Sequence, residues 1–250
     1  MIEVNNVSFE IDGRTILNDI NLKIPEGKIY GIIGPNGVGK TTLLRCLTGI
    51  YETTKGLVKY DGENVYDNPK VKEIIGYVAD ENIMHPNFRV KDLIKFYKYS
   101  YTKFDEKKFK ELNEIFKIPE RKFIFQLSKG MKMRLSIMLA FSIHAKYLIL
   151  DEPTSGLDAI LKNKLLKIFA DEVYDNNTTI IISSHHLNEL ERICDDVAIL
   201  DNGVISYENS LENMKNKIKK IQIAFDEPVY EEDLNLKGIF KISKVGRVFT

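Results

Sequence analysis

The segment GPNGVGKT, residues 34–41, constrains the fold of this 250-residue chain more than any other part. It fits the pattern G-x-x-x-x-G-K-[ST], follows the apolar run at residues 28–33, and precedes a predicted helix that Gly49 ends. Glycines in such a loop let backbone N–H groups curl around a phosphate, and the helix N-terminus adds positive potential. The segment therefore predicts a strand, a phosphate-binding loop and a helix in succession.

The apolar pattern on either side of this loop predicts an α/β fold. Residues 2–24 and 56–65 alternate with period two, which is typical of antiparallel ribbons. Helical periodicity holds from about residue 90 to 145, and short apolar runs then alternate with helices that start near Asp158 and His186. This order predicts a parallel, helix-covered sheet with an antiparallel β portion and a helical insertion.

Charge and cysteine content exclude several classes of protein. Lys+Arg and Asp+Glu balance at 36 each, so no global basic field would attract nucleic acid. Cys46 and Cys194 lack metal-ligand spacing and are expected to be buried, reduced thiols. No signal peptide and no apolar run of ~20 residues is present, so we expect a cytoplasmic chain that reaches a membrane only through a partner.

Domain boundaries follow from the same patterns. We expect one domain over residues 1–208, with a helical subdomain at about 83–145. Residues 209–250 begin with a basic helix at 210–220 and turn strand-like, which predicts an appended, incomplete small α/β element.

Two further stretches carry candidate catalytic residues. In the loop, Lys40 would reach the β- and γ-phosphates of a nucleotide, and the Thr41 hydroxyl would bind Mg²⁺. The run YLILDE (147–152) predicts a strand buried on both faces that places Asp151 at its carboxyl edge, where ligands bind in open α/β sheets. Asp151 would hold the metal directly or through water, and Glu152 would act as general base towards the attacking water.

The stretch SSHH (183–186) also follows an apolar strand, so it should lie at the same edge of the sheet. A histidine there can hydrogen-bond a γ-phosphate or the attacking water. The alternative is a helix start capped by Ser184, with a surface histidine. We favour His185 for the site and His186 for the helix.

The stretch LSKGM (127–131) opens an amphipathic helix and has two interpretations. Ser128 and Gly130 at a helix N-terminus suit anion binding. The same residues also suit an ordinary capped helix start.

Together, the phosphate loop, LSKGM, YLILDE, SGLD (155–158) and SSH resemble the motif order of ATP-binding-cassette (ABC) ATPases over about residues 1–208. The resemblance implies a P-loop NTPase fold with a RecA-like core, an antiparallel β subdomain and an α-helical subdomain. It also implies ATP and Mg²⁺ as ligands. No N-K-x-D motif for reading guanine is present, which disfavours a GTPase.

The resemblance assigns roles residue by residue. Glu152 matches the catalytic glutamate and His185 the switch histidine. With the loop lysine Lys40 they make up the implied catalytic set. Ser128, Gly130 and Asp158 match residues that contact the nucleotide of an opposite subunit. The nucleotide-binding set that it implies is Gly34, Pro35, Asn36, Gly37, Val38, Gly39, Lys40, Thr41, Thr42, Ile11, Ser128, Gly130 and Asp158, and the metal set is Thr41, Asp151 and Asp80.

Three departures from the family pattern stand out. Lys129 and Met131 replace the first glycine and the glutamine of L-S-G-G-Q, a variant that resembles those of bacterial exporters of drugs, lantibiotics and bacteriocins. The Lys129 side chain would either point to solvent, which we favour, or add positive charge beside the phosphate. Asp80 stands where the family has glutamine, unless Glu81 or Asn82 takes that position. Ile11 aligns with the aromatic residue that stacks on adenine, and Phe9 on the same strand face is a possible substitute.

The leading hypothesis is the ATP-hydrolysing subunit of an ABC transporter, and we favour an exporter of drug, peptide or lipid-like substrates. Two subunits, identical or different, would close head to tail around two ATPs and drive a separate transmembrane permease from the cytoplasmic face of the membrane. Residues 82–101 are a candidate docking surface for that permease.

The alternative is a soluble ABC ATPase of translation, repair or cluster assembly. Such proteins carry two cassettes or long coiled coils, which this chain lacks, and no nucleic acid partner is expected. A non-ABC phosphate-loop enzyme ranks last, because it would make LSKGM and SGLD accidental matches.

Overall fold

The computed structural model describes residues 1–80, 84–213, 223–224, 244–245 and 248–249. They divide into two compact units, Met1–Leu211 and Glu212–Thr250. In the second unit, three short strands pair in the order β11-β13-β12. Their bounds are β11 (Ile223–Ala224), β12 (Lys244–Val245) and β13 (Val248–Phe249). The rest of the predicted appendage, including most of its basic helix, lies outside the described residues.

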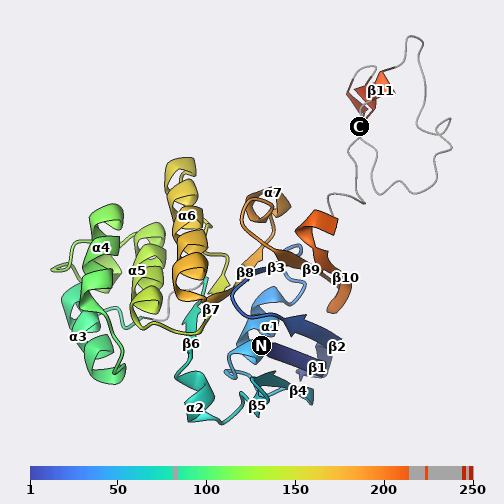
Figure 1. The fold of residues 1–250 in the computed structure, drawn as a ribbon, viewed down its shortest axis with the longest axis horizontal. Coiled ribbons are helices and arrows are strands. Elements are labelled where there is room, and N and C mark those ends of the chain that lie inside the picture. Colours follow the sequence, from blue (N-terminus) through green and yellow to red (C-terminus); the bar gives the residue numbers. More distant parts are fainter. Residues whose placement is uncertain (81–83, 214–222, 225–243, 246–247, 250) are drawn as a thin grey trace. The chain divides into compact units, whose positions relative to one another are not determined.

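A six-stranded sheet in the order β10-β9-β3-β8-β7-β6 forms the centre of the first unit (Figure 1). Five strands are parallel, and β10 pairs antiparallel with β9 at one edge. Every residue of β3, β7 and β8 is buried, which is why these strands read as continuous apolar runs in the sequence. The bounds are β3 (Ile29–Ile33), β6 (Ile75–Val78), β7 (Tyr147–Asp151), β8 (Thr179–Ser184), β9 (Asp196–Asp201) and β10 (Val204–Ser210).

A second, antiparallel sheet has the order β2-β1-β4-β5. Its β4–β5 hairpin turns at Asp61 and Gly62, whose φ angles of 52° and 89° give the left-handed turn that the Asp-Gly pair predicts. The bounds are β1 (Ile2–Ile11), β2 (Arg14–Ile24), β4 (Lys55–Tyr60) and β5 (Glu63–Asn64).

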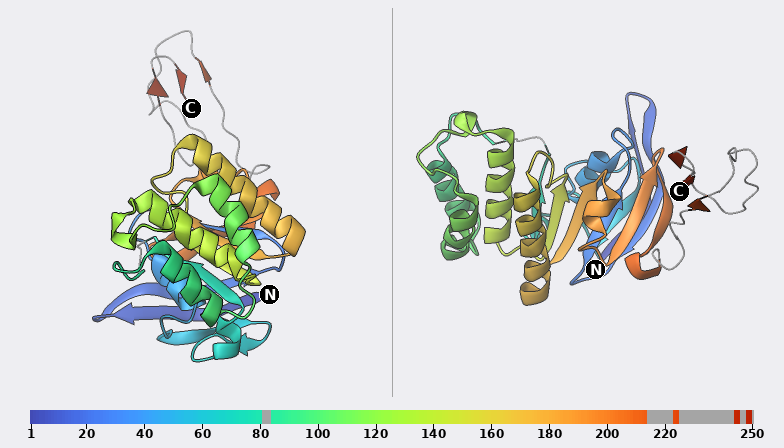
Figure 2. Two further views of the ribbon diagram at one scale, coloured as in Figure 1. Left: turned by 90° about the vertical axis from the view of Figure 1, so that its left-hand side faces the viewer. Right: turned by 90° about the horizontal axis from the view of Figure 1, so that it is seen from above.

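Helices cover the central sheet and form a separate group beside it. Helices α3, α4 and α5 stand together at the end of the unit remote from the antiparallel sheet, as Figures 1 and 2 show. None of the helices within the described residues is long and apolar enough to cross a membrane. The bounds are α1 (Lys40–Leu47), α2 (Pro69–Lys72), α3 (Val90–Ser100), α4 (Glu106–Phe116), the 3₁₀ turn η1 (Ile124–Gln126), α5 (Lys129–Ser142), α6 (Ala159–Asn176) and α7 (Leu187–Leu190).

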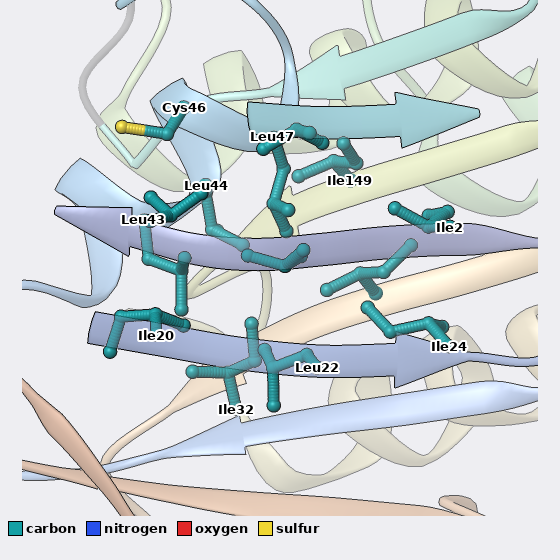
Figure 3. Close-up of a cluster of buried hydrophobic side chains, with 14 of the residues drawn as sticks. Ile2, Ile20, Leu22, Ile24, Ile32, Leu43, Leu44, Cys46, Leu47 and Ile149 are labelled. Atoms are coloured by element: carbon teal, nitrogen blue, oxygen red, sulfur yellow. The ribbon is translucent and has the colours of Figure 1, made fainter. Parts of the chain in front are cut away.

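The hydrophobic core between the two sheets fixes the position of α1. Figure 3 shows Leu43, Leu44 and Leu47 of α1 among isoleucines of β1, β2 and β3, and all of these side chains are fully buried. Burying one such side chain stabilises the fold by about 1.5–3 kcal/mol. This packing places the loop at residues 34–39, which precedes α1, at the carboxyl ends of the central strands.

Several element boundaries lie close to those predicted. Asp158 is the N-cap of α6 and His186 the N-cap of α7, and Gly49, with φ 64°, follows the end of α1. The strand β10 runs through Ser210, two residues beyond the predicted domain boundary. Cys46 and Cys194 are buried free thiols, as expected.

Candidate nucleotide site

The loop between β3 and α1 has a shape that only its glycines permit. An added Cβ at Gly34 would lie 2.4 Å from the carbonyl oxygen of Leu200, so no side chain fits there. Gly37 and Gly39 have φ angles of 84° and 105°, a region that other residues rarely adopt. The Gly34 N–H donates to the Ser184 carbonyl, which ties the loop to the end of β8. The loop is therefore preformed.

The Lys40 side chain folds back into this loop and donates to its carbonyl oxygens. Its Nζ lies 2.8 Å from the carbonyl oxygen of Gly34 and 3.1 Å from that of Pro35. The same ammonium is 3.3 Å from Oε1 of Glu152, and only 6% of the side chain is exposed. A buried ammonium held at a helix N-terminus among backbone groups is a strong phosphate-binding element.

The remaining loop residues surround this ammonium with accessible backbone. Pro35, Asn36 and Gly37 are exposed, whereas Val38, Gly39 and Thr42 are half-buried. The loop thus presents its outer backbone to solvent while its lysine stays inside.

Asp151 lies completely buried at the end of β7 and accepts two short hydrogen bonds. Thr41 Oγ1 donates to Oδ2 at 2.7 Å, and Ser183 Oγ donates to Oδ1 at 2.6 Å. Burial raises the pKa of Asp151 above its ordinary value, and nearby Asp80 and Glu152 raise it further, against the lowering effect of the two hydroxyls. A buried carboxylate with negative neighbours favours a cation at this point.

Glu152 is held in an unusual backbone conformation directly after the strand. Its φ angle is 48°, and its N–H donates to Ser183 Oγ at 2.9 Å. The carboxylate is bound on two sides, by Lys40 through Oε1 and by His185 Nδ1 at 2.9 Å through Oε2. Strained residues of this kind cluster at functional sites. Glu152, Lys40 and His185, all predicted as catalytic, therefore meet at one point.

The second histidine lies outside this network. The His186 N–H donates to Ser184 Oγ at 3.0 Å, and His186 is the N-cap of α7. The predicted division between the two histidines matches this geometry, and Ser184 contacts the helix start as the capping alternative supposed.

Ser128 and Gly130 lie at the start of α5. Ser128 is the N-cap, and its Oγ accepts from the Met131 N–H at 3.2 Å. A Cβ added at Gly130 would meet only Gly156 O and Leu157 Cδ2, both at 3.6 Å, so the fold itself does not need glycine here. Asp158, beyond them, caps α6 through the Leu161 N–H at 2.9 Å. Among the described residues, no hydrogen bond or ion pair joins these three to Lys40, Asp151 or Glu152.

The residues considered for adenine stacking differ in accessibility. Ile11 is 49% exposed at the end of β1. Phe9 stacks on Tyr51 with the ring centroids 5.0 Å apart and packs against the core. Phe9 is therefore half-buried beside Tyr51, and Ile11 is the more exposed of the two.

Asp80 and Lys129, two of the departures from the family pattern, form an ion pair. Lys129 Nζ lies 2.9 Å from Asp80 Oδ1, so the lysine pairs with a carboxylate of its own chain and does not simply point to solvent as expected.

Sequence reasoning missed the role of Ser183. Its hydroxyl donates to Asp151 Oδ1 and accepts from the Glu152 N–H, a role that the SSHH stretch did not indicate. The available signal was its place at the end of an apolar strand beside the predicted catalytic strand.

A preformed glycine loop with a buried lysine, facing a Thr–Asp pair and a glutamate–histidine pair, defines a phosphate-loop nucleoside triphosphatase. Comparison with known proteins narrows the class. The "ABC transporter" family model matches residues 17–155. The ABC transporter ATP-binding protein YtrB of Bacillus subtilis is 37% identical over 92% of this chain and 78% of its own length. The lantibiotic transport ATP-binding protein SrtF of Streptococcus pyogenes is 32% identical over 90% and 99%.

Solved structures agree on the fold. An ATP-binding subunit of an ABC transporter superposes with a TM-score of 0.78 at 24% identity, over 87% of this chain and 92% of that one. A dimeric ATP-binding cassette in a post-hydrolysis state with ADP and phosphate gives 0.76 at 21% identity, over 84% and 99%. The chain belongs to the ABC transporter family. It is an ATP-binding, ATP-hydrolysing transporter subunit with the ABC ATPase fold.

Proposed function

We propose that two such subunits close head to tail around two ATP molecules, with Mg²⁺, and thereby drive a separate transmembrane permease at the cytoplasmic face of the membrane. The observation that carries the proposal is the separation of the site into two surfaces. Lys40, Asp151, Glu152 and His185 converge at the sheet edge, whereas Ser128 and Gly130 stand apart at the exposed start of α5. A second subunit would bring the two surfaces together.

The start of α5 fits such an approach. The Ser128 hydroxyl accepts a hydrogen bond from the helix but keeps its own proton for donation to a phosphate oxygen. A Cβ added at Gly130 would make only ordinary contacts at 3.6 Å, so internal packing does not explain the glycine. The capped helix start and the anion site, considered above as alternatives, are therefore compatible.

The nucleotide would be held by the residues of the loop. Phosphate oxygens are stronger partners for Lys40 than the two carbonyls that it contacts, and the exposed loop backbone faces outwards to receive them. Glu152 would take a proton from the attacking water, with His185 fixing the direction of its carboxylate. Asp151 would keep Thr41 oriented through their shared hydrogen bond.

The donor set at this edge fits Mg²⁺. The described residues contain no group of three or more His, Cys, Asp or Glu side chains able to hold a metal by themselves. Mg²⁺ needs fewer protein ligands, because it keeps waters and takes substrate phosphate oxygens. Thr41 and Asp151 would hold it, with Asp80 contributing through water, and the ion would neutralise charge on the transferred phosphoryl group.

The helical group supplies a surface for the permease. On α3, Phe96 and Tyr99 are 54% and 80% exposed beside the exposed Lys91, Lys95 and Lys98. Aromatic side chains are enriched in the cores of interaction surfaces, which have a polar rim. Relatives named for bacitracin transport, from Bacillus licheniformis and 31% identical, and for lantibiotic transport support export of peptide-like or drug-like compounds.

The test is Glu152→Gln, which keeps the side-chain shape but removes the base. With saturating Mg²⁺–ATP the variant should bind nucleotide, hydrolyse it poorly and run as a dimer in size-exclusion chromatography with light scattering. Lys40→Ala is the matched control and should remain monomeric because it loses tight ATP binding. A Glu152→Gln chain that binds ATP and stays monomeric would contradict closure between two copies.

The partner is tested separately by purifying the full chain from its native membranes in mild detergent. Retention of a polytopic membrane protein is expected. Recovery with ribosomes or nucleic acid, and with no membrane protein, would favour the soluble alternative.

A further inference from the structure

The ion pair between Asp80 and Lys129 connects the catalytic edge of the sheet to the start of α5. Val78 of β6 pairs in register with Leu150 of β7, so Asp80 follows β6 just as Glu152 follows β7. Asp80 is near enough to Asp151 for its charge to raise the Asp151 pKa. Lys129 is the first residue of α5 and adjoins Ser128. One contact of 2.9 Å therefore spans the two surfaces described above.

Lys129 has an electrostatic reason to prefer this partner. A positive charge at a helix N-terminus is unfavourable, and the first turn of α5 has no acidic residue of its own. Asp80 supplies that missing negative charge from another element. Its Oδ1 is buried, and among the described residues Lys129 is the cation that pairs with it.

We propose that Asp80 and Lys129 form a latch in which Asp80 is shared between Lys129 and a cation at the nucleotide site, so that occupation of the site loosens the start of α5. This inference rests on the proposed function. The pair is weak enough to exchange, because 63% of Lys129 and 35% of Asp80 remain exposed. Pairs of this kind change an equilibrium by no more than about fivefold.

The latch explains why Asp80 and Lys129, two departures from the family pattern, occur together. A glycine at 129 would leave Asp80 without its cation, and a glutamine at 80 would leave Lys129 without its carboxylate. Lys129 is thus a positioning residue that acts on the nucleotide site through Asp80.

A double-mutant cycle with Lys129→Met and Asp80→Asn tests the latch. Without nucleotide, thermal unfolding of the full chain should show a non-additive shift in midpoint for the two changes. With Mg²⁺ and a fluorescent ATP analogue, Lys129→Met should tighten binding by up to about fivefold, because Asp80 is then free for the cation. Lys129→Met in the Asp80→Asn chain should leave the affinity unaltered. In EDTA, where no Mg²⁺ is available to Asp80, Lys129→Met alone should likewise leave the affinity unaltered.

Lys132→Met is the matched control, because it removes a charge from the same turn of α5 at a residue with no ion pair in the described structure. It should alter neither measurement. The reversed pair, Asp80→Lys with Lys129→Asp, should restore the unfolding midpoint.

Additive midpoints, or an affinity change that persists in the Asp80→Asn chain, would overturn the latch. If no variant and no wild-type chain binds the analogue, the proposed function fails. The latch itself is then still decided by the unfolding cycle.

Discussion

Gly130 is a residue at which the fold and the proposed function make opposite demands, so Gly130→Ala separates them. It is the second residue of α5, its φ angle is not in the left-handed region, and an added Cβ meets atoms no closer than 3.6 Å. Alanine also restricts the unfolded chain more than glycine does. Gly130→Ala should therefore stabilise the chain by about 0.5 kcal/mol, the lower end of the usual range. For a chain of this size the melting temperature rises by roughly 1–2 °C.

Catalysis should change in the opposite direction. If the γ-phosphate bound to a second subunit approaches the Gly130 backbone, the new methyl group occupies that space. A misplacement of this size should lower the rate of hydrolysis at least about tenfold, equivalent to roughly 1.4 kcal/mol. ATP binding to the monomeric chain should be unchanged, because Gly130 has no contact with the loop that holds Lys40.

The assays are differential scanning calorimetry, phosphate release at saturating ATP, and nucleotide binding by equilibrium dialysis. Ser136→Ala is the control, since it also raises helix propensity in α5 but lies a further turn and a half along the helix. It should gain stability without losing activity. A Gly130→Ala chain with full activity would refute the composite site. A lower melting temperature would refute the packing argument.

Three further predictions concern a hydroxyl, a guanidinium and two thiols whose side chains are buried or half-buried in the fold. Ser183→Ala should destabilise the fold by about 1–3 kcal/mol in urea unfolding and slow hydrolysis, because Asp151 Oδ1 loses its donor and the Glu152 N–H its acceptor; unchanged stability would contradict this. Arg134→Met should cost about 1–2 kcal/mol, since Arg134 donates to the carbonyls of Gly130 and Phe116, whereas Lys132→Met should stay within about 0.5 kcal/mol. Burial raises the pKa of the Cys46 thiol to about 12 and that of Cys194 above its usual range, so neither thiol should react with a thiol reagent at pH 8 until urea unfolds the chain. The neutral thiols favour the folded state, so their contribution to stability is lost as pH rises above about 9, where the unfolded thiol ionises, through 12.

The sequence predicted those features that depend on local pattern. The strands β7 and β8 contain continuous apolar runs, at residues 148–150 and 180–182, so both their existence and the carboxyl ends that carry Asp151 and His185 could be located. The loop at 34–41 could also be predicted, because the glycines that its backbone conformation requires appear in the sequence at a recognisable spacing. The fold class followed from the order of these elements and is confirmed by the comparison with solved structures.

Features that depend on tertiary pairing were not predictable in this way. The Ser183 hydroxyl acquires its role only when β8 lies beside β7 and its oxygen meets both Asp151 and the Glu152 N–H. The stacking of Phe9 on Tyr51 likewise joins segments far apart in the sequence. Hydrophobic periodicity gives the face of a strand that a side chain occupies, but not which distant residue it contacts.

The charges of the site explain why Asp80 and Lys129 have to be considered together. Asp80, Asp151 and Glu152 bring three carboxylates to one edge of the sheet, where Lys40 pairs with Glu152 and Lys129 pairs with Asp80. An ATP molecule would add further negative charge, so binding requires compensation by a cation. A neutral glutamine at position 80 would lessen the need for positive charge at the site, whereas Asp80 increases that need. Lys129, at the start of α5, offsets the charge of Asp80. The strength of the latch should therefore fall with added salt, because its pair is exposed, while the buried Lys40–Glu152 pair should be far less sensitive.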